Sequence, residues 1–301
     1  MNKMRCFRVS LLILSLAVAV MAIVAGCVGN TSQSTKIVTV TLPPQKYIVE
    51  QIAGDRLDVR CLLSNGANPE TYDPTVTNMM NLDKSIAYLR IGNVGFEDAV
   101  LGKISHANPS LPIYDISEGI ELITGTHTHY HAHDGETVEH DTPDPHTWTS
   151  VKNARVMAAN VLSALKEIDP ANTEDYNERY ERFVNRLDSL DSAFSSRLEA
   201  AGTPSFIVWH PSLSYFARDY GLTQIVAGGS ENKESSVTAV RQAIDKATET
   251  GAGVFFYQKD IDNRQLAALN SSIKATEVNI NPLSADWEDE MIKIVDALTA
   301  K

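Results

Sequence analysis

The sequence predicts an α/β protein of two lobes, each built on a mainly parallel sheet, joined by one long helix. In both halves of the chain, short runs of β-branched and aromatic residues alternate with segments of helical length, which favours parallel strands covered by helices on both faces. Between the halves, residues 173–201 contain neither Gly nor Pro and carry one continuous apolar stripe. The 301 residues are enough for two domains with hydrophobic cores of their own.

The first 27 residues predict an export signal. Three basic residues precede an apolar run over 9–25, which is too short for a permanent transmembrane helix. The run closes on Val-Ala-Gly-Cys, which resembles a bacterial lipobox, so we expect Cys27 to become the lipidated first residue of the mature protein. A plain signal peptide with an incidental cysteine is the alternative. Residues 28–35 are small and polar and predict a flexible tether.

Eight runs predict strands, and they divide the chain into an N-terminal lobe over 36–172 and a C-terminal lobe over 202–301. All are short, rich in β-branched or aromatic residues, and separated by helical-length segments. The runs are 36–41, 57–63, 86–91 and 112–116 in the first half, and 205–209, 223–227, 254–257 and 276–280 in the second.

Residues 173–201 predict the longest helix. Their apolar residues recur at spacings of three and four, Thr173 is a suitable N-cap, and Gly202 supplies the stop. At ~1.5 Å per residue such a helix is roughly 40 Å long. We predict that it joins the lobes and limits their relative motion; a helix wholly inside one lobe is the alternative.

Charge and cysteine content narrow the classes of partner and site. The net charge of -12 argues against a nucleic-acid partner. Cys6 lies in the signal and Cys27 is expected to carry lipid, so only Cys61 remains. The mature chain therefore has no intramolecular disulfide and no cysteine-type zinc site, and Cys61 is expected to be a small buried hydrophobe.

A histidine-rich segment over 126–141 predicts metal handling, since neutral imidazole is the commonest protein metal ligand. Gly125 precedes the segment, Gly135 lies within it, and acidic residues stand among its histidines. This composition indicates a mobile loop suited to metal capture rather than tight coordination. The alternative is a solvated polar loop with histidines by chance. Five of the eight histidines lie in it: His127, His129, His131, His133 and His140.

Four further segments each follow a predicted strand or form a turn, where α/β folds build ligand sites. They span 65–74, 144–148, 209–222 and 279–287. In this order and spacing, they resemble the substrate-binding proteins of zinc and manganese ABC uptake systems. The best-matched pieces are Asp-Pro-His-x-Trp at 144–148 and the His210 segment, and the histidine-rich segment looks like the loop typical of the zinc branch. The resemblance covers nearly all of the mature chain and implies two Rossmann-like lobes joined by a backbone helix.

The resemblance implies metal ligands at Glu70, His146, His210 and Asn281. The family usually has His where this chain has Glu70, and Asp where it has Asn281. Carboxylate oxygen binds zinc at ~2.0–2.2 Å, whereas an amide oxygen is a neutral and weaker donor. Direct binding by Asn281, a coordinated water, orientation of a neighbour and a simple turn before Pro282 all stay open. For the two histidines and Glu70, the alternative is an ordinary structural or surface role.

The function that the resemblance implies is that of an extracytoplasmic, lipid-anchored zinc-binding protein that delivers Zn²⁺ to an ABC permease and its ATPase. We expect a monomer, in the periplasm or on the outer face of the cytoplasmic membrane. A mixed set of nitrogen and oxygen ligands suits zinc and tolerates Mn²⁺. The histidine-rich segment favours zinc over manganese, with nickel or copper behind.

Two other classes of function remain as alternatives. A zinc hydrolase also uses three protein ligands with an open position, but the chain has no His-Glu-x-x-His pattern and neither histidine motif has a Glu at helical spacing. We therefore expect no enzyme activity. A metal-binding adhesin or zinc buffer without a transporter is the remaining alternative.

Overall fold

The computed structural model describes residues 35–64, 66–69, 71–124, 127–133, 136–228, 237–259 and 263–300. The residues Lys36–Lys301 form one compact unit. The predicted signal and the expected lipidation site at Cys27 lie outside the described residues. Among the helices that the structure describes, none is long and apolar enough to cross a membrane.

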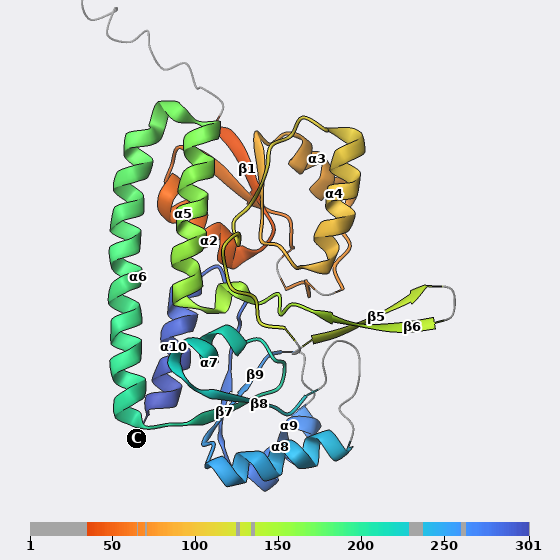
Figure 1. Cartoon of the computed structure of the whole chain (residues 1–301), viewed down its shortest axis with the longest axis vertical. Coiled ribbons are helices and arrows are strands. Elements are labelled where there is room, and N and C mark those ends of the chain that lie inside the picture. Colours follow the sequence, from red (N-terminus) through yellow and green to blue (C-terminus); the bar gives the residue numbers. More distant parts are fainter. Residues whose placement is uncertain are drawn as a thin grey trace, which may run out of the picture. The chain divides into compact units, whose positions relative to one another are not determined.

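The N-terminal lobe is built on a parallel sheet with the strand order β2-β1-β3-β4. Val38 and Val40 of β1 are fully buried, as expected for a strand of a sheet covered on both faces. Helices α4 and α5 lie on opposite sides of this sheet (Figure 1). The elements are β1 (Lys36–Val40), α2 (Pro43–Ala53), β2 (Leu57–Cys61), α3 (Val76–Asp83), β3 (Ala87–Arg90), α4 (Gly95–Ala107), β4 (Ile113–Asp115), the 3₁₀ turn η1 (Thr147–Thr149) and α5 (Val151–Ile168).

The C-terminal lobe repeats this plan with the parallel order β10-β9-β7-β8. Helices α8 and α9 pack on each other beside one face of the sheet, where Ile207 and Phe255 are fully buried. All eight predicted strands are confirmed, with ends one or two residues shorter in most cases. The elements are β7 (Ser205–Val208), α7 (Ser214–Tyr220), β8 (Thr223–Val226), α8 (Val237–Thr250), β9 (Val254–Tyr257), α9 (Asn263–Ile273), β10 (Thr276–Asn279) and α10 (Trp287–Thr299).

The backbone of the histidine-rich segment differs from the irregular loop that its glycines predict. The strands β5 (His127–His133) and β6 (Glu136–Thr142) pair antiparallel, with His129 opposite His140 (Figure 1). In the sequence, Asp-Gly stands between the two strands, and this dipeptide favours two-residue hairpins.

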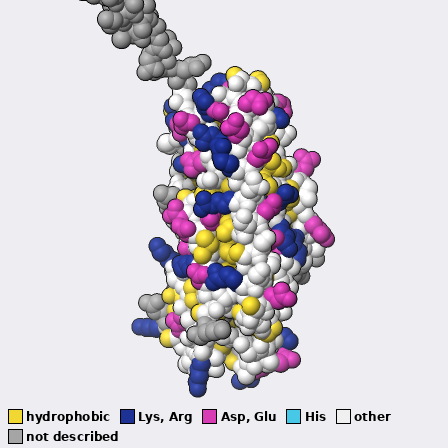
Figure 2. Space-filling model, turned by 90° about the vertical axis from the view of Figure 1, so that its left-hand side faces the viewer, with side chains coloured by type: hydrophobic (Ala, Val, Ile, Leu, Met, Phe, Trp, Pro, Cys, Tyr) yellow, Lys and Arg dark blue, Asp and Glu magenta, His cyan; other side chains and the backbone are white. Residues whose placement is uncertain are grey.

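The long helix α6 (Thr173–Ala201) has the bounds that its apolar stripe predicts. It follows the short turn η2 (Pro170–Asn172) and ends at Gly202, which has a left-handed φ of 65° and donates its N–H to the carbonyl of Leu198. The helix packs against α2 and α5 of the N-terminal lobe and α10 of the C-terminal lobe. It therefore joins the two lobes. The face seen in Figure 2, on the side of α6, carries acidic and basic side chains interspersed.

A buried carboxylate ties helices of both lobes to α6. Glu288 of α10 is only 7% exposed, and it accepts hydrogen bonds from the Tyr47 hydroxyl of α2 at 2.8 Å and from Nε of Arg186 of α6 at 2.8 Å. The Tyr47 ring also lies 5.8 Å from the Trp287 ring between centroids. One carboxylate therefore connects α2, α6 and α10, which belong to the N-terminal lobe, the joining helix and the C-terminal lobe.

A second buried carboxylate, Asp169, joins the starts of β1 and α6. It accepts hydrogen bonds from Nζ of Lys36 at 2.8 Å, the Tyr176 hydroxyl at 2.6 Å and Nδ2 of Asn172 at 2.6 Å. Burial by itself raises the pKa of Asp169, but these hydrogen bonds and the charge of Lys36 outweigh it. The net pKa therefore lies below the ordinary aspartate value.

We expect Asp169→Asn to lower the free energy of unfolding at pH 7 by about 1–3 kcal/mol, because it leaves buried donors without a charged acceptor. A carboxylate with a depressed folded-state pKa stabilises the protein above its unfolded pKa of about 3.9, and this contribution is lost as the pH falls through the folded-state pKa. Urea unfolding of both proteins at pH 7 and pH 3 tests this. The difference between them should shrink at pH 3, and an equal difference at both values would contradict the assignment.

Candidate metal centre

A cavity of about 360 Å³ lies where the carboxyl ends of strands from both sheets meet. In parallel sheets this edge is where ligands bind. The N-terminal lobe contributes the segment after β2 and the start of η1, and the C-terminal lobe contributes the segments after β7, β9 and β10. Each of the four sequence-predicted segments supplies lining residues. The described lining residues are Pro43 and residues within 63–69, 146–148, 210–212, 258–259 and 279–285.

Two of the predicted ligands, His146 and His210, meet in this cavity. Their Nε2 atoms lie 3.2 Å apart, and the ring centroids are 5.0 Å apart at 72°. His146 precedes η1 and is 4% exposed, whereas His210 follows β7 and is half-buried. Imidazoles from the two lobes therefore approach each other through the same ring nitrogen, Nε2.

The orientation of His146 is set by Asp144, which is fully buried. One oxygen of Asp144, Oδ1, lies 2.8 Å from Nδ1 of His146 and 2.9 Å from its backbone nitrogen. A carboxylate at Nδ1 selects the tautomer with hydrogen on that nitrogen, which makes Nε2 the nitrogen that carries the lone pair. This carboxylate–histidine pair is the arrangement found behind many zinc ligands.

The Asp144 backbone is held in turn by Tyr215 of α7. The Tyr215 hydroxyl donates to the carbonyl of Asp144 at 2.7 Å and accepts the N–H of Ile123 at 3.3 Å. Burial raises the pKa of Tyr215 to about 12, so the hydroxyl keeps its proton and remains a donor at neutral pH. The C-terminal lobe thus positions a histidine of the N-terminal lobe.

Two tryptophans connect the loop after β10 to the loop of His146. The indole Nε1 of Trp148 donates to the carbonyl of Pro282 at 2.9 Å, and Nε1 of Trp287 donates to the carbonyl of Trp148 at 2.7 Å. Both rings are almost fully buried. These reciprocal bonds hold the wall that contains Asn281 against η1.

The position of His210 depends on close packing around Trp209. The Trp209 N–H donates to the carbonyl of Phe256 in β9 at 2.9 Å, and its own carbonyl accepts the N–H of Gly228 at 3.0 Å. A Cβ at position 228 would overlap that carbonyl oxygen and lie 2.6 Å from Cδ2 of the indole. A residue with no side chain is therefore needed beside His210.

The two remaining predicted ligands differ in what the structure describes. Asn281 lines the cavity, and its Oδ1 accepts the N–H of Leu283 at 3.3 Å, which is a turn-forming role that the sequence left open. Glu70 lies outside the described residues, although its neighbour Pro69 lines the cavity. Within the described ranges, no group of three or more His, Cys, Asp and Glu side chains gathers at a metal-binding distance. A ligand role for these residues stays a prediction.

The sequence reasoning missed Gln258 and Lys259, which line the cavity directly after β9. Nε2 of Gln258 donates to the hydroxyl of Ser212 at 3.1 Å, which joins two walls of the C-terminal lobe. Both residues directly follow a predicted strand, and residues in such positions often line ligand sites of parallel sheets, so this position could have indicated them. It was overlooked because neither residue belongs to a motif with metal-binding side chains.

We expect Asp144→Asn to weaken zinc binding by about 10–100-fold, which is the usual cost of altering a group that orients a metal-bound histidine. An amide keeps the size of the side chain but removes the charge behind Nδ1. Competition with a chromogenic zinc chelator measures the affinity, and circular dichroism checks that the variant is folded. Unchanged affinity in a folded variant would mean that Asp144 does not orient a ligand.

Comparison with known proteins gives the same picture of fold and family. The family model described as "Zinc-uptake complex component A periplasmic", ZnuA, matches residues 38–301. The High-affinity zinc uptake system protein ZnuA of Bacillus subtilis is 26% identical, over 92% of this chain and 90% of that protein.

Solved structures of ZnuA share the fold of this chain. A crystal structure of ZnuA superimposes with a TM-score of 0.75 at 30% identity, over 88% of this chain and 100% of that chain. A zinc-bound deletion mutant of ZnuA gives a TM-score of 0.75 at 30% identity, over 89% of this chain and 100% of that chain. With two parallel-sheet lobes, a long joining helix and a matching family model over nearly the whole folded unit, the chain belongs to the ZnuA family of zinc-uptake components.

Proposed function

We propose that this protein binds Zn²⁺ as cargo through Nε2 of His146 and His210 and passes it to an ABC permease. The observation that carries the proposal is the 3.2 Å separation of these nitrogens. Two nitrogen ligands at ~2.0–2.1 Å from a tetrahedral zinc ion lie roughly 3.3–3.4 Å apart. The observed separation of the two nitrogens is therefore close to that of two ligands on one zinc ion.

Glu70 is our choice for the third ligand, and Asn281 or water for the fourth. Two neutral imidazoles and one carboxylate leave a net charge near +1 with a divalent cation, and carboxylate oxygen is an accepted zinc ligand. The position of Pro69 in the cavity wall supports this choice, since Glu70 is the next residue. Asn281 belongs to the opposite wall.

Ligands from both lobes make the ion a link between them. A bound ion stabilises the lobe arrangement that completes its coordination, and a transporter that recognises this arrangement selects the loaded protein. The name of the Bacillus subtilis relative, a zinc uptake system protein, supports transport as the role.

Anchoring through Cys27 and action as a monomer complete the proposal. Cys27→Ala should move the exported protein from the membrane fraction to the soluble fraction.

The test of this function is competition between Zn²⁺ and Mn²⁺ for the purified wild type, followed by metal analysis. We expect one tightly held equivalent of zinc that manganese does not displace. Preferential retention of manganese would favour the manganese-binding alternative, and a protein with no tight site for either metal would contradict the proposal. Glu70→Ala should weaken zinc binding if Glu70 is a ligand.

We expect deletion of residues 126–141 to lower the number of zinc equivalents bound without weakening the tight site. The segment contains five histidines, and the cavity-lining residues that the structure describes lie outside it. Isothermal titration of both proteins with zinc gives the stoichiometry and the affinity together. Loss of the tight equivalent on deletion would show that the histidine-rich segment itself forms the main site.

A further inference from the structure

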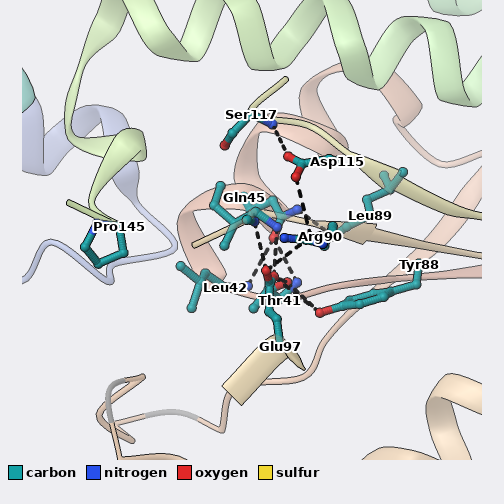
Figure 3. Close-up of polar contacts among 12 residues, drawn as sticks. Thr41, Leu42, Gln45, Tyr88, Leu89, Arg90, Glu97, Asp115, Ser117 and Pro145 are labelled. Atoms are coloured by element: carbon teal, nitrogen blue, oxygen red, sulfur yellow. Dashed lines mark hydrogen bonds and ion pairs between the residues drawn. The ribbon is translucent and has the colours of Figure 1, made fainter. Parts of the chain in front are cut away.

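Glu97 is a buried carboxylate of the N-terminal lobe that is not among the described residues lining the metal cavity. It lies in the first turn of α4 and is 1% exposed. Its Oε1 accepts the N–H of Ile91 at 2.8 Å, and its Oε2 accepts the N–H of Gly92 at 2.8 Å. The hydroxyl of Thr41 also donates to Oε1 (Figure 3). The carboxylate thus joins the carboxyl ends of β1 and β3 to the start of α4.

These contacts require a carboxylate rather than an amide. Backbone N–H groups approach both oxygens, and a glutamine side chain has only one oxygen to offer them. The Tyr88 hydroxyl also donates to Oε1 at 3.3 Å, and Nε of Arg90, 3.5 Å from Oε2, brings a positive charge close to the carboxylate. Figure 3 shows these groups gathered around Glu97, with Gln45 beside Thr41.

From Thr41, the contacts lead to the wall of the metal cavity. The carbonyl of Thr41 accepts the N–H of Leu63 at 3.0 Å and the thiol of Cys61 at 3.3 Å. Burial raises the pKa of Cys61 to about 12, so its thiol stays protonated and able to donate. Leu63 and Ser64 line the cavity. One end of the segment after β2 is therefore attached to Glu97 through a single residue.

The other end of that segment is held by the same turn of α4. Phe96 packs edge-on against Tyr72, with ring centroids 5.2 Å apart. The Tyr72 hydroxyl donates to the carbonyl of Leu62 at 2.9 Å and lies 3.2 Å from the hydroxyl of Ser64. Adjacent residues of α4 thus fix both ends of the chain between 62 and 72, a stretch that contains Glu70 in the sequence and several cavity-lining residues of this lobe.

We propose that Glu97 is a positioning residue for zinc. Its carboxylate fixes the position of the segment after β2 in the cavity wall, and ligand binding requires that position. The proposal rests on the function proposed above. A small displacement of this wall changes the geometry at the ion, and shifts of about 1 Å in a preorganised site are costly. Glu97 acts through Thr41 and Leu63 and does not contact the ion.

The experiment compares Glu97→Gln, Thr41→Val and the double variant in the full chain. We expect each single change to weaken zinc binding about tenfold, similar to other groups that act behind metal ligands. The double variant should lose less than the product of the two effects, because both changes break one connection. The visible absorption of bound Co²⁺, which reports coordination geometry, should differ from wild type in all three variants.

Asp169→Asn is the matched control, since it also removes a buried carboxylate that accepts several hydrogen bonds, but at the opposite end of β1. It should lower thermal stability and leave the zinc affinity and the Co²⁺ spectrum unchanged. Wild-type zinc affinity and spectrum in folded Glu97→Gln would overturn the proposal. If Glu97→Gln does not fold, the same result in Thr41→Val would overturn it.

The two proposals fail in different ways. A wild type without a tight zinc site, or a His146→Ala variant that binds zinc like the wild type, contradicts the proposed function. A wild type and His146→Ala that behave as expected, together with an unaffected Glu97→Gln, contradict only the role of Glu97.

Discussion

Replacing either His146 or His210 by alanine is expected to lower the zinc affinity by more than about 100-fold. Changes in groups that merely orient a ligand cost about 10–100-fold, and removing the ligand itself costs more. The two Nε2 atoms lie 3.2 Å apart in the same cavity. Each histidine therefore fills a separate ligand position, and the remaining one does not compensate for the loss of the other. Chelator competition with the purified variants measures the loss.

Thermal unfolding gives an independent measure of the same loss. At 100 times its Kd, a ligand that binds only the folded state stabilises it by about 2.7 kcal/mol. Zinc should therefore raise the melting temperature of the wild type, and at the same concentration it should raise that of the histidine variants much less. His106→Ala is the matched control, because His106 is exposed on α4 and bonds only within its own helix among the contacts described. An equal loss in His106→Ala would show that the assay reports surface histidines rather than the cavity.

Gly228→Ala is expected to destabilise the protein by about 1–3 kcal/mol and to weaken zinc binding at least about tenfold. The new Cβ would overlap the carbonyl oxygen of Trp209 and press on its indole. Because a backbone atom is in the way, the strain cannot be relieved by a side-chain rotation alone. The peptide of Trp209 has to move, and His210 is the next residue. Urea unfolding and zinc competition on the same preparation measure the two effects.

Gly102→Ala provides the control for this substitution. Gly102 lies within α4, and a Cβ there would meet no atom within 4 Å. Alanine in a helix interior is favoured over glycine by roughly 0.5–1 kcal/mol, so this variant should be slightly more stable and bind zinc normally. If Gly228→Ala retains the wild-type zinc affinity, the packing of Trp209 does not determine where His210 lies.

The strands and the long helix could be predicted because their signals are local. The run over 36–41 has the alternation and β-branching of a strand, and β1 occupies Lys36–Val40. Residues 173–201 contain neither Gly nor Pro, Gly202 follows them, and α6 ends at Ala201. The antiparallel pairing of β5 with β6 was not predicted, because the glycines and acidic residues of the histidine-rich segment indicate a mobile loop.

The cavity itself was predictable only in part. The motifs around His146 and His210 identified chemically suitable side chains at the ends of strands, but the sequence separates them by 64 positions. Neither Glu97 nor Gly228 belongs to a motif that the sequence singles out, whereas Tyr215 lies in the His210 segment, which the sequence does single out. The importance of all three comes from contacts with residues distant in the chain, and such contacts leave no periodic pattern.

The sequence by itself determined the two sets of strands, the joining helix and the motifs by which the family is recognised, because each depends on residues close together in the chain. The tertiary structure alone decided that His146 and His210 place their Nε2 atoms 3.2 Å apart, with Asp144 behind one of them. That distance depends on how α6, α7 and the two tryptophans pack the lobes against each other, and packing between distant segments is a property of the folded chain as a whole.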